Sequence, residues 1–310
     1  MRRLLLLLGA CLMTAAACVG AGPSSPTPGG SPTPGASPTA GPTASQAGSP
    51  GYVVATQPDK LILRIATGGG FVAPGYLLSA VPEFALYGDG RIVVPGPVAE
   101  IYPGPLLPNL LVERVTPTEI QKIVAAADGA GLLGPDASFD AVGIADASTT
   151  VFTTVVDGRA HRISAYALSE SGGRGPTGDP TVEAARAKLA QFWTQMSDLS
   201  TFLGRPVSDT EAYVPTGMRV FLGDAGPADP AQPTAQVVAW PLTADPAQVG
   251  QPTAVQGTVC VALTGADLSI FLGVARTANA AAVWTYGSAR YAVTVRPLYP
   301  NESGCAGGAL

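Results

Sequence analysis

Short runs of apolar and β-branched residues, separated by turn-forming residues, dominate the chain beyond residue 60. Residues 84–87 and 91–94 flank Gly88-Asp89-Gly90, and residues 149–156 and 160–168 flank Asp157-Gly158. β-Formers around such short Gly/Asp loops predict two hairpins, and Asp-Gly favours a type I′ turn. We predict further strands at 61–65, 110–115, 218–222, 236–240, 255–263, 282–286 and 290–296.

Three segments change to the spacing of a helix. Thr116-Pro117-Thr118-Glu119 combines a capping threonine, a proline at the first helical position and a glutamate three residues after the cap. A second helix starts at Asp179-Pro180, carries an apolar stripe from Val182 to Leu199 and is expected to end near Gly204. The segment from Thr264 to Asp267 resembles a third helix start.

Strands outnumber helices, and neighbouring strands look linked by hairpins. This pattern predicts an α+β fold, with antiparallel sheets and a few helices packed on one face. Regular β-α-β alternation is missing, which argues against a doubly wound sheet and a two-lobed solute-binding protein. Residues 204–217 read as a connection, so we expect two small domains, an N-terminal one over 52–204 and a C-terminal one over 205–310.

The N-terminus has the layout of a secretory signal. Arg2 and Arg3 precede an apolar stretch that runs to Ala17, too short and wrongly flanked for a lasting transmembrane helix. Cys18 follows three alanines, and small residues before a cysteine resemble the lipobox of bacterial lipoproteins. The resemblance implies that residues 1–17 are a signal peptide and that Cys18 carries a thioether-linked diacylglycerol.

Two alternatives remain open for this segment. Leu8-Gly9-Ala10-Cys11 fits the lipobox letters better, but it leaves an apolar stretch of only about seven residues, at the short end for a signal. An ordinary secretory signal with two incidental cysteines is the other possibility. We favour Cys18 because a linker follows it immediately.

Residues 18–51 form a low-complexity linker, attached to the lipid through Cys18. Beyond that cysteine it is almost entirely Gly, Ser, Thr, Pro and Ala, without a charged or aromatic residue. Such a segment buries too little apolar surface to offset its ordering entropy, so we expect disorder. It would reach about 35 Å as a flexible coil and at most about 100 Å as polyproline. That length lifts a domain off a bilayer.

Composition narrows the range of partners. Charged residues make up 13% of the chain, about half the usual share in soluble domains. The net charge of −5 argues against a nucleic-acid partner held by phosphate contacts. It also gives no basic patch for anionic lipid, so membrane attachment would come from the acyl chains. We therefore expect the protein on the outer face of the cytoplasmic membrane.

Beyond the signal and the lipid-bearing Cys18, only Cys260 and Cys305 remain. Two cysteines in an exported chain most often pair, so we predict a disulfide between them. The alternative is a reactive thiol with His161 as its base.

Catalytic signatures are absent from the sequence. No Ser-x-x-Lys and no Gly-x-Ser-x-Gly occurs, which argues against β-lactamase-like and α/β-hydrolase sites. A Ser-His-Asp triad would need His161, the single histidine, which we interpret as a structural or surface residue on a strand.

Metal and phosphate signatures are equally weak. Asp136, Asp140 and Asp146 cluster near a loop, but their spacing misses the EF-hand pattern, so we interpret them as solvated loop acids. Gly68-Gly69-Gly70 lacks the lysine of a phosphate loop and reads as a tight turn. We predict no catalytic, cofactor-binding or metal-ligating residue.

Several strings resemble hypothetical lipoproteins and secreted proteins of high-GC actinobacteria. They are Gly68-Gly69-Gly70-Phe71, residues 84–91, Ile101-Tyr102-Pro103-Gly104-Pro105, residues 149–152 and residues 296–300. The resemblance covers nearly all of residues 60–305 and implies a surface location without an established activity.

Together these features predict a membrane-anchored extracytoplasmic lipoprotein that binds a cell-envelope polymer or protein and has no evident catalytic site. One alternative is an envelope hydrolase with an Asp/Glu pair, which would place two carboxylates about 5–9.5 Å apart across a pocket. The other is a purely structural envelope component, whose sign would be an unbroken convex surface.

Overall fold

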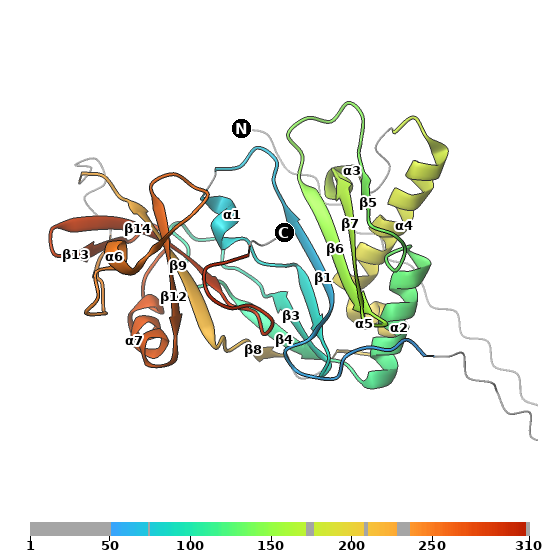
Figure 1. Cartoon of the computed structure of the whole chain (residues 1–310), viewed down its shortest axis with the longest axis horizontal. Coiled ribbons are helices and arrows are strands. Elements are labelled where there is room, and N and C mark those ends of the chain that lie inside the picture. The colour runs from blue at the N-terminus through green and yellow to red at the C-terminus, as the bar shows by residue number, and fades with distance from the viewer. Residues whose placement is uncertain (1–50, 74, 172–176, 208–209, 228–235, 308–310) are drawn as a thin grey trace, which may run out of the picture. The chain divides into compact units, whose positions relative to one another are not determined.

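Two β-sheets, each mostly antiparallel, carry the helices of this protein (Figure 1). The computed structural model describes residues 51–73, 75–171, 177–207, 210–227 and 236–307. The α+β class with antiparallel sheets is confirmed. The predicted signal, Cys11, Cys18 and the linker up to residue 50 lie outside the described residues. The predicted division into domains at residue 204 stays a prediction.

The first sheet has the strand order β5-β7-β6-β1-β2-β3-β4-β8. All its neighbours are antiparallel except β5 and β7. The strands are β1 (Leu61–Gly68), β2 (Phe84–Tyr87), β3 (Arg91–Pro95), β4 (Leu110–Arg114), β5 (Ala137–Phe139), β6 (Thr149–Val156), β7 (Arg159–Tyr166) and β8 (Glu211–Ala212).

Both predicted hairpins are present, as β2–β3 and β6–β7. Asp157 and Gly158 have φ of 53° and 72°, the pair of positive values that a type I′ turn needs. The second hairpin ends earlier than predicted, since Leu168 begins the short helix α3 (Leu168–Ser171). The sequence analysis missed β5, whose three residues pair in parallel with β7. It also missed β8, which lies in the predicted connection and pairs with β4.

Helices cover one face of this sheet, as predicted. They are α2 (Pro117–Gly129), α4 (Pro180–Ser197) and α5 (Leu199–Leu203), which ends at Gly204 in the left-handed conformation. Their apolar sides meet the sheet in one core, which includes Ile65, Ile123, Phe152 and Phe192. In β1 the register shifts between Leu61 and Leu63, so Ile62 and Leu63 both join this core. Arg64 pairs with Ala85, which belongs to a different cluster on the opposite face.

The opposite face is covered over β2–β4 by the chain that follows the last strand. Tyr299 is buried there against Tyr87, Val93 and Val112. The Tyr87 hydroxyl donates to Asn301 Oδ1 at 2.8 Å. This small second core takes in Leu61 at the start of β1 but leaves the rest of that face of β1, and the same face of β6 and β7, outside the apolar clusters.

The second sheet has the order β10-β13-β14-β9-β12-β11. Its strands are β9 (Gly217–Asp224), β10 (Val237–Ala239), β11 (Gln251–Pro252), β12 (Thr258–Thr264), β13 (Val283–Tyr286) and β14 (Ala289–Pro297). Helix α7 (Gly265–Ala275) packs on one face, where Phe271 stacks on Trp284 with ring centroids 5.4 Å apart. The predicted strand 255–263 begins only at Thr258, because Gly257 has φ 75° and the Thr258 amide closes a turn onto Val255 O.

Two more short helices complete the described fold, α1 (Tyr76–Ser79) and α6 (Pro246–Val249). Among the described residues, no helix combines the length and apolarity that a bilayer span requires.

The predicted start of α2 is confirmed in detail and gives a pH-dependent prediction. The Thr116 hydroxyl accepts from the Glu119 amide, and the Glu119 carboxylate accepts the Thr116 amide at 2.8 Å. The Glu119 carboxylate also forms an ion pair with Arg205, whose Nε lies 2.5 Å from it. The hydrogen bonds from Arg205, followed by those from Thr116, lower the pKa of the Glu119 carboxyl to about 2.

We expect Glu119→Gln to lower the free energy of unfolding by about 1 kcal/mol at neutral pH. Because the folded pKa is depressed, the stabilisation is complete above the ordinary value of 4.5 and disappears as the pH falls toward about 2. The difference between wild type and variant should therefore shrink in that interval, as measured by urea unfolding at several pH values. Glu183→Gln, in the first turn of α4, is the matched control. A difference that stays constant across this interval would contradict the assignment.

Candidate functional site

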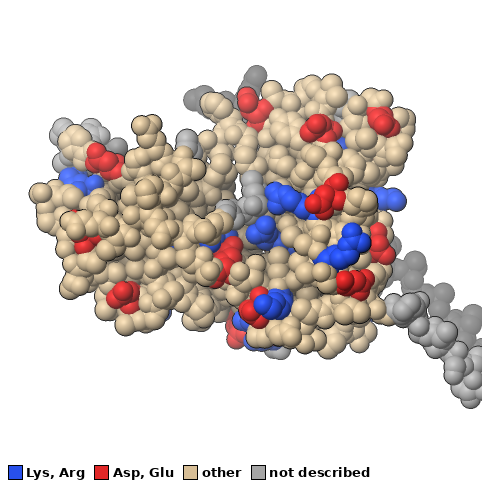
Figure 2. All heavy atoms as spheres, viewed as in Figure 1, with Lys and Arg blue, Asp and Glu red and all other residues tan. Residues whose placement is uncertain are grey.

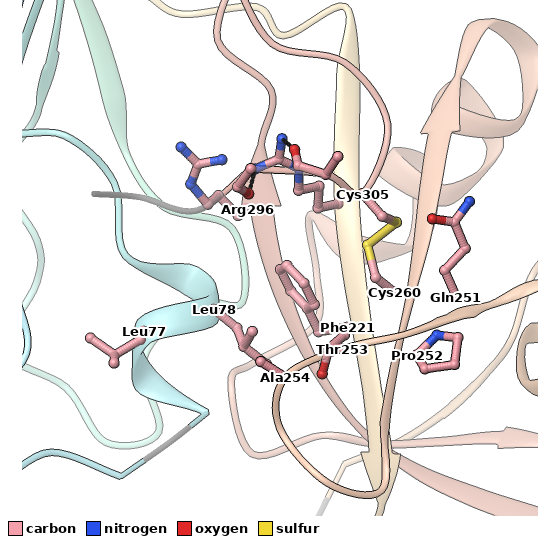
Figure 3. Close-up of a pocket in the computed structure, with 13 residues that line it drawn as sticks. Leu77, Leu78, Phe221, Gln251, Pro252, Thr253, Ala254, Cys260, Arg296 and Cys305 are labelled. Atoms are coloured by element: carbon pink, nitrogen blue, oxygen red, sulfur yellow. Dashed lines mark hydrogen bonds between the residues drawn. A yellow bond between two sulfur atoms is a disulfide. The ribbon is translucent and has the colours of Figure 1, made fainter.

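A cavity of about 390 Å³ lies beside the second sheet, on the face away from α7. Leu77 and Leu78 of α1 line one side, and Gln251 and Pro252 line the other (Figure 3). Phe221 and the disulfide lie between them in this view. The wall combines apolar side chains with the polar side chains of Gln251, Thr253 and two arginines, a mixed lining that suits the binding of a ligand.

The predicted disulfide between Cys260 and Cys305 is confirmed, with an Sγ–Sγ distance of 2.07 Å. Cys260 is buried on β12, directly opposite Phe221 on β9. The bond therefore holds the segment 304–307 against the sheet and makes that segment a wall of the cavity. Because both sulfurs are used, neither forms the reactive thiol considered as the alternative.

Two buried arginines lie at this wall. Arg219 on β9 and Arg296 on β14 are direct cross-strand partners, so both side chains lie on the face away from α7. Within the described ranges, Arg219 donates only to backbone carbonyls, those of Gly304 and Gly307 at 2.8 Å and that of Ala306. Burial lowers the pKa of the Arg219 guanidinium because it disfavours the charged form.

Arg296 has a carboxylate partner. Its two Nη atoms donate to Glu302, at 2.9 and 2.7 Å, and its Nε donates to Ala80 O at 2.8 Å. Glu302 also accepts the Tyr299 amide at 3.1 Å. Arg296 thus ties the second sheet to the segment before β2 and to the chain after β14.

The described cavities lack a facing pair of carboxylates. Asp224 is the single acid in one of them and Asp267 in another, and none of the others described has any. None of these cavities therefore offers the geometry that a two-carboxylate hydrolase requires. The cavities also break the convex surface that a purely structural role would favour.

His161 lies on the core side of β7 and lines none of the described cavities. It is 9% exposed, and its Nδ1 is 2.7 Å from Gly134 O. A carbonyl only accepts, so Nδ1 carries the proton, and the imidazole is a structural donor. The Gly68–Gly70 segment forms a turn in which Gly70 has φ 79°, and a Cβ there would lie 2.8 Å from Asp146 O.

The aspartates considered for calcium do not come together. Asp136 accepts the Arg162 amide at 2.8 Å, and Asp140 influences Arg186 electrostatically. Within the described ranges, no three His, Cys, Asp or Glu residues gather as they would around a metal.

Sequence reasoning missed the buried arginines. Arg219 and Arg296 interrupt the apolar runs Met218–Leu222 and Val293–Pro297. A charged residue within such an apolar run indicates a buried arginine with a partner, because arginine is almost never fully buried unless paired.

No known family model matches this chain, and neither a curated protein nor a solved structure is significantly similar to it. The resemblance to actinobacterial surface lipoproteins therefore stays a prediction from the sequence.

Proposed function

We propose that this protein is a lipid-anchored module on the outer face of the cytoplasmic membrane that binds a component of the cell envelope. The observation that carries the proposal is the order of features along the chain. A signal-like segment ends at Cys18, a Pro/Ser/Thr/Gly spacer follows, and a folded region with a disulfide comes last. The disulfide supports an oxidising compartment, because cytosolic thiols are kept reduced. The cavity beside it, lined by apolar and polar side chains, supports binding.

The anchor is tested by detergent phase partition and intact mass of the full chain, expressed in an actinobacterial host. We expect the wild-type protein in the detergent phase, with a mature mass that starts at a diacylglycerol-modified Cys18. Cys18→Ser removes the thiol that the lipid needs, so this variant should move to the aqueous phase.

Cys11→Ser is the matched control, since Cys11 is the rival acylation site. It should partition as the wild type does. A reversed result would move the anchor to Cys11, and a wild-type chain in the aqueous phase would reject the anchor.

Binding is tested with the lipid-free Cys18→Ser chain on purified envelope fractions. If the envelope fractions retain the chain at none of the salt concentrations tested, the proposed binding of an envelope component is contradicted.

A further inference from the structure

Arginines gather on the face of the first sheet that the helices leave free. Figure 2 shows several Lys and Arg side chains in the middle of the view, with Asp and Glu among them, where β1 and β6 lie in Figure 1.

The strand register places three polar residues in one row. Arg162 on β7 pairs directly with Thr153 on β6, and Thr153 pairs directly with Arg64 on β1. Direct cross-strand partners project from the same face, so the Thr153 hydroxyl lies between the two arginine side chains. The two arginine Cα atoms are about 10 Å apart, twice the spacing of neighbouring strands. Both guanidinium groups can therefore reach a small group above Thr153.

Two buried polar atoms in this row have no partner. Arg64 Nε and Thr153 Oγ1 are shielded from solvent and hydrogen-bond to no described residue. The Arg64 side chain is half-buried and forms no ion pair with the described acids. Leaving such groups unsatisfied is costly, and unexplained cases in native proteins are rare.

The surrounding charges favour an anion. Burial lowers the pKa of Arg64; the charge of Glu302 opposes this effect, while the nearby Arg162 and Arg296 add to it. Two carboxylates lie near this row, and both already accept hydrogen bonds. Glu302 accepts hydrogen bonds from both Nη atoms of Arg296, and Asp136 accepts one from the Arg162 amide.

We propose that Arg64, Thr153 and Arg162 form a binding site for a tetrahedral oxyanion, the phosphate group of a free ion or of an ester. Two guanidinium forks and a hydroxyl supply more donors than the two oxygens of a carboxylate can accept. A phosphate group has enough oxygens and enough charge to satisfy them. The site goes beyond the proposed function and does not depend on the lipid anchor.

The test is equilibrium dialysis of the full-length Cys18→Ser chain, disulfide intact, against labelled inorganic phosphate at constant ionic strength. We expect saturable binding, weakened about tenfold or more in Arg162→Gln, because a charge-assisted hydrogen bond is lost. Arg162 is exposed, so this variant should fold. Competition by glycerol phosphate distinguishes the two sources, since an ester displaces the label only if the site admits one. Arg159→Gln is the matched control, because Arg159 is an exposed arginine on the same strand that points to the other face.

Thr153→Val separates a ligand contact from a structural role. Without phosphate, this variant should be at least as stable as the wild type, because it removes a buried hydroxyl that has no partner. It should nevertheless bind phosphate more weakly and lose the rise in melting temperature that phosphate gives the wild type. The proposal is overturned if the wild type binds no phosphate saturably. It is also overturned if Arg162→Gln binds as the wild type does, or if Arg159→Gln weakens binding equally.

Discussion

Replacing Glu302 by glutamine is expected to lower the free energy of unfolding by about 3–5 kcal/mol, as for other buried ion pairs that lose one partner. Glu302 and Arg296 are joined at 2.7 Å, and their side chains are only 10% and 1% exposed. Without the carboxylate charge, the Arg296 guanidinium stays buried beside Arg64 and Arg219 with no counterion. Urea unfolding of both proteins at neutral pH measures the difference.

The chain supplies a matched control for this prediction. Arg114 and Glu211 are also joined at 2.7 Å, but their side chains are 50% and 56% exposed. Glu211→Gln should therefore cost less than about 1 kcal/mol, because water solvates the remaining arginine. Equal decreases in the free energy of unfolding in Glu302→Gln and Glu211→Gln would show that burial of an ion pair does not decide how much it stabilises the fold.

Removing the disulfide is expected to have the second large effect. Cys260 and Cys305 close a loop of 45 residues, and a loop of this length contributes about 4 kcal/mol in the chain-entropy model. The segment it holds supplies the carbonyl partners of Arg219, so its release would also expose a buried guanidinium to water. A double replacement of both cysteines by alanine should lower the urea midpoint accordingly.

Reductant provides the control for the disulfide. It should destabilise the wild type by a similar amount and leave the double alanine variant unchanged, since that variant has no bond to reduce. A wild-type chain whose urea midpoint is insensitive to reductant, under conditions that free both thiols, would contradict the prediction. Phosphate binding in the double variant reports whether the Arg64 row keeps its geometry without the bond.

Local sequence signals predicted most of the regular structure. Thr116-Pro117 and Glu119 define the start of α2 through contacts within four residues, so the sequence alone is enough. Asp157-Gly158 determines the β6–β7 turn in the same way, because few residues accept two consecutive positive φ values.

Strand pairings with distant partners could not be predicted. β5 has three residues and pairs in parallel with β7. The strand at β10 was predicted, but its parallel pairing with β13 was not, since that partner lies in another part of the chain. Nothing in three residues specifies such a partner. The same limit applies to β8, whose two residues gain their place only by pairing with β4.

The candidate sites divide in the same way. The pairing of Cys260 with Cys305 followed from their number, since no other cysteine remains beyond the signal-like segment. The row Arg162–Thr153–Arg64 did not follow, because β6 and β1 are separated in the chain by β2–β5 and by α2.

The sequence by itself determined the α+β class, the two hairpins, the helix starts and the disulfide, because each depends on local geometry or on simple counting. It also carries the prediction of export and anchoring, which depends on residues 1–50. Only the tertiary structure decided which strands are neighbours and therefore which charges meet. The register of β7, β6 and β1 brings two arginines and a hydroxyl together, and the pairing of β9 with β14 buries two more arginines. Long-range pairing depends on the packing of whole sheets, which no short segment encodes.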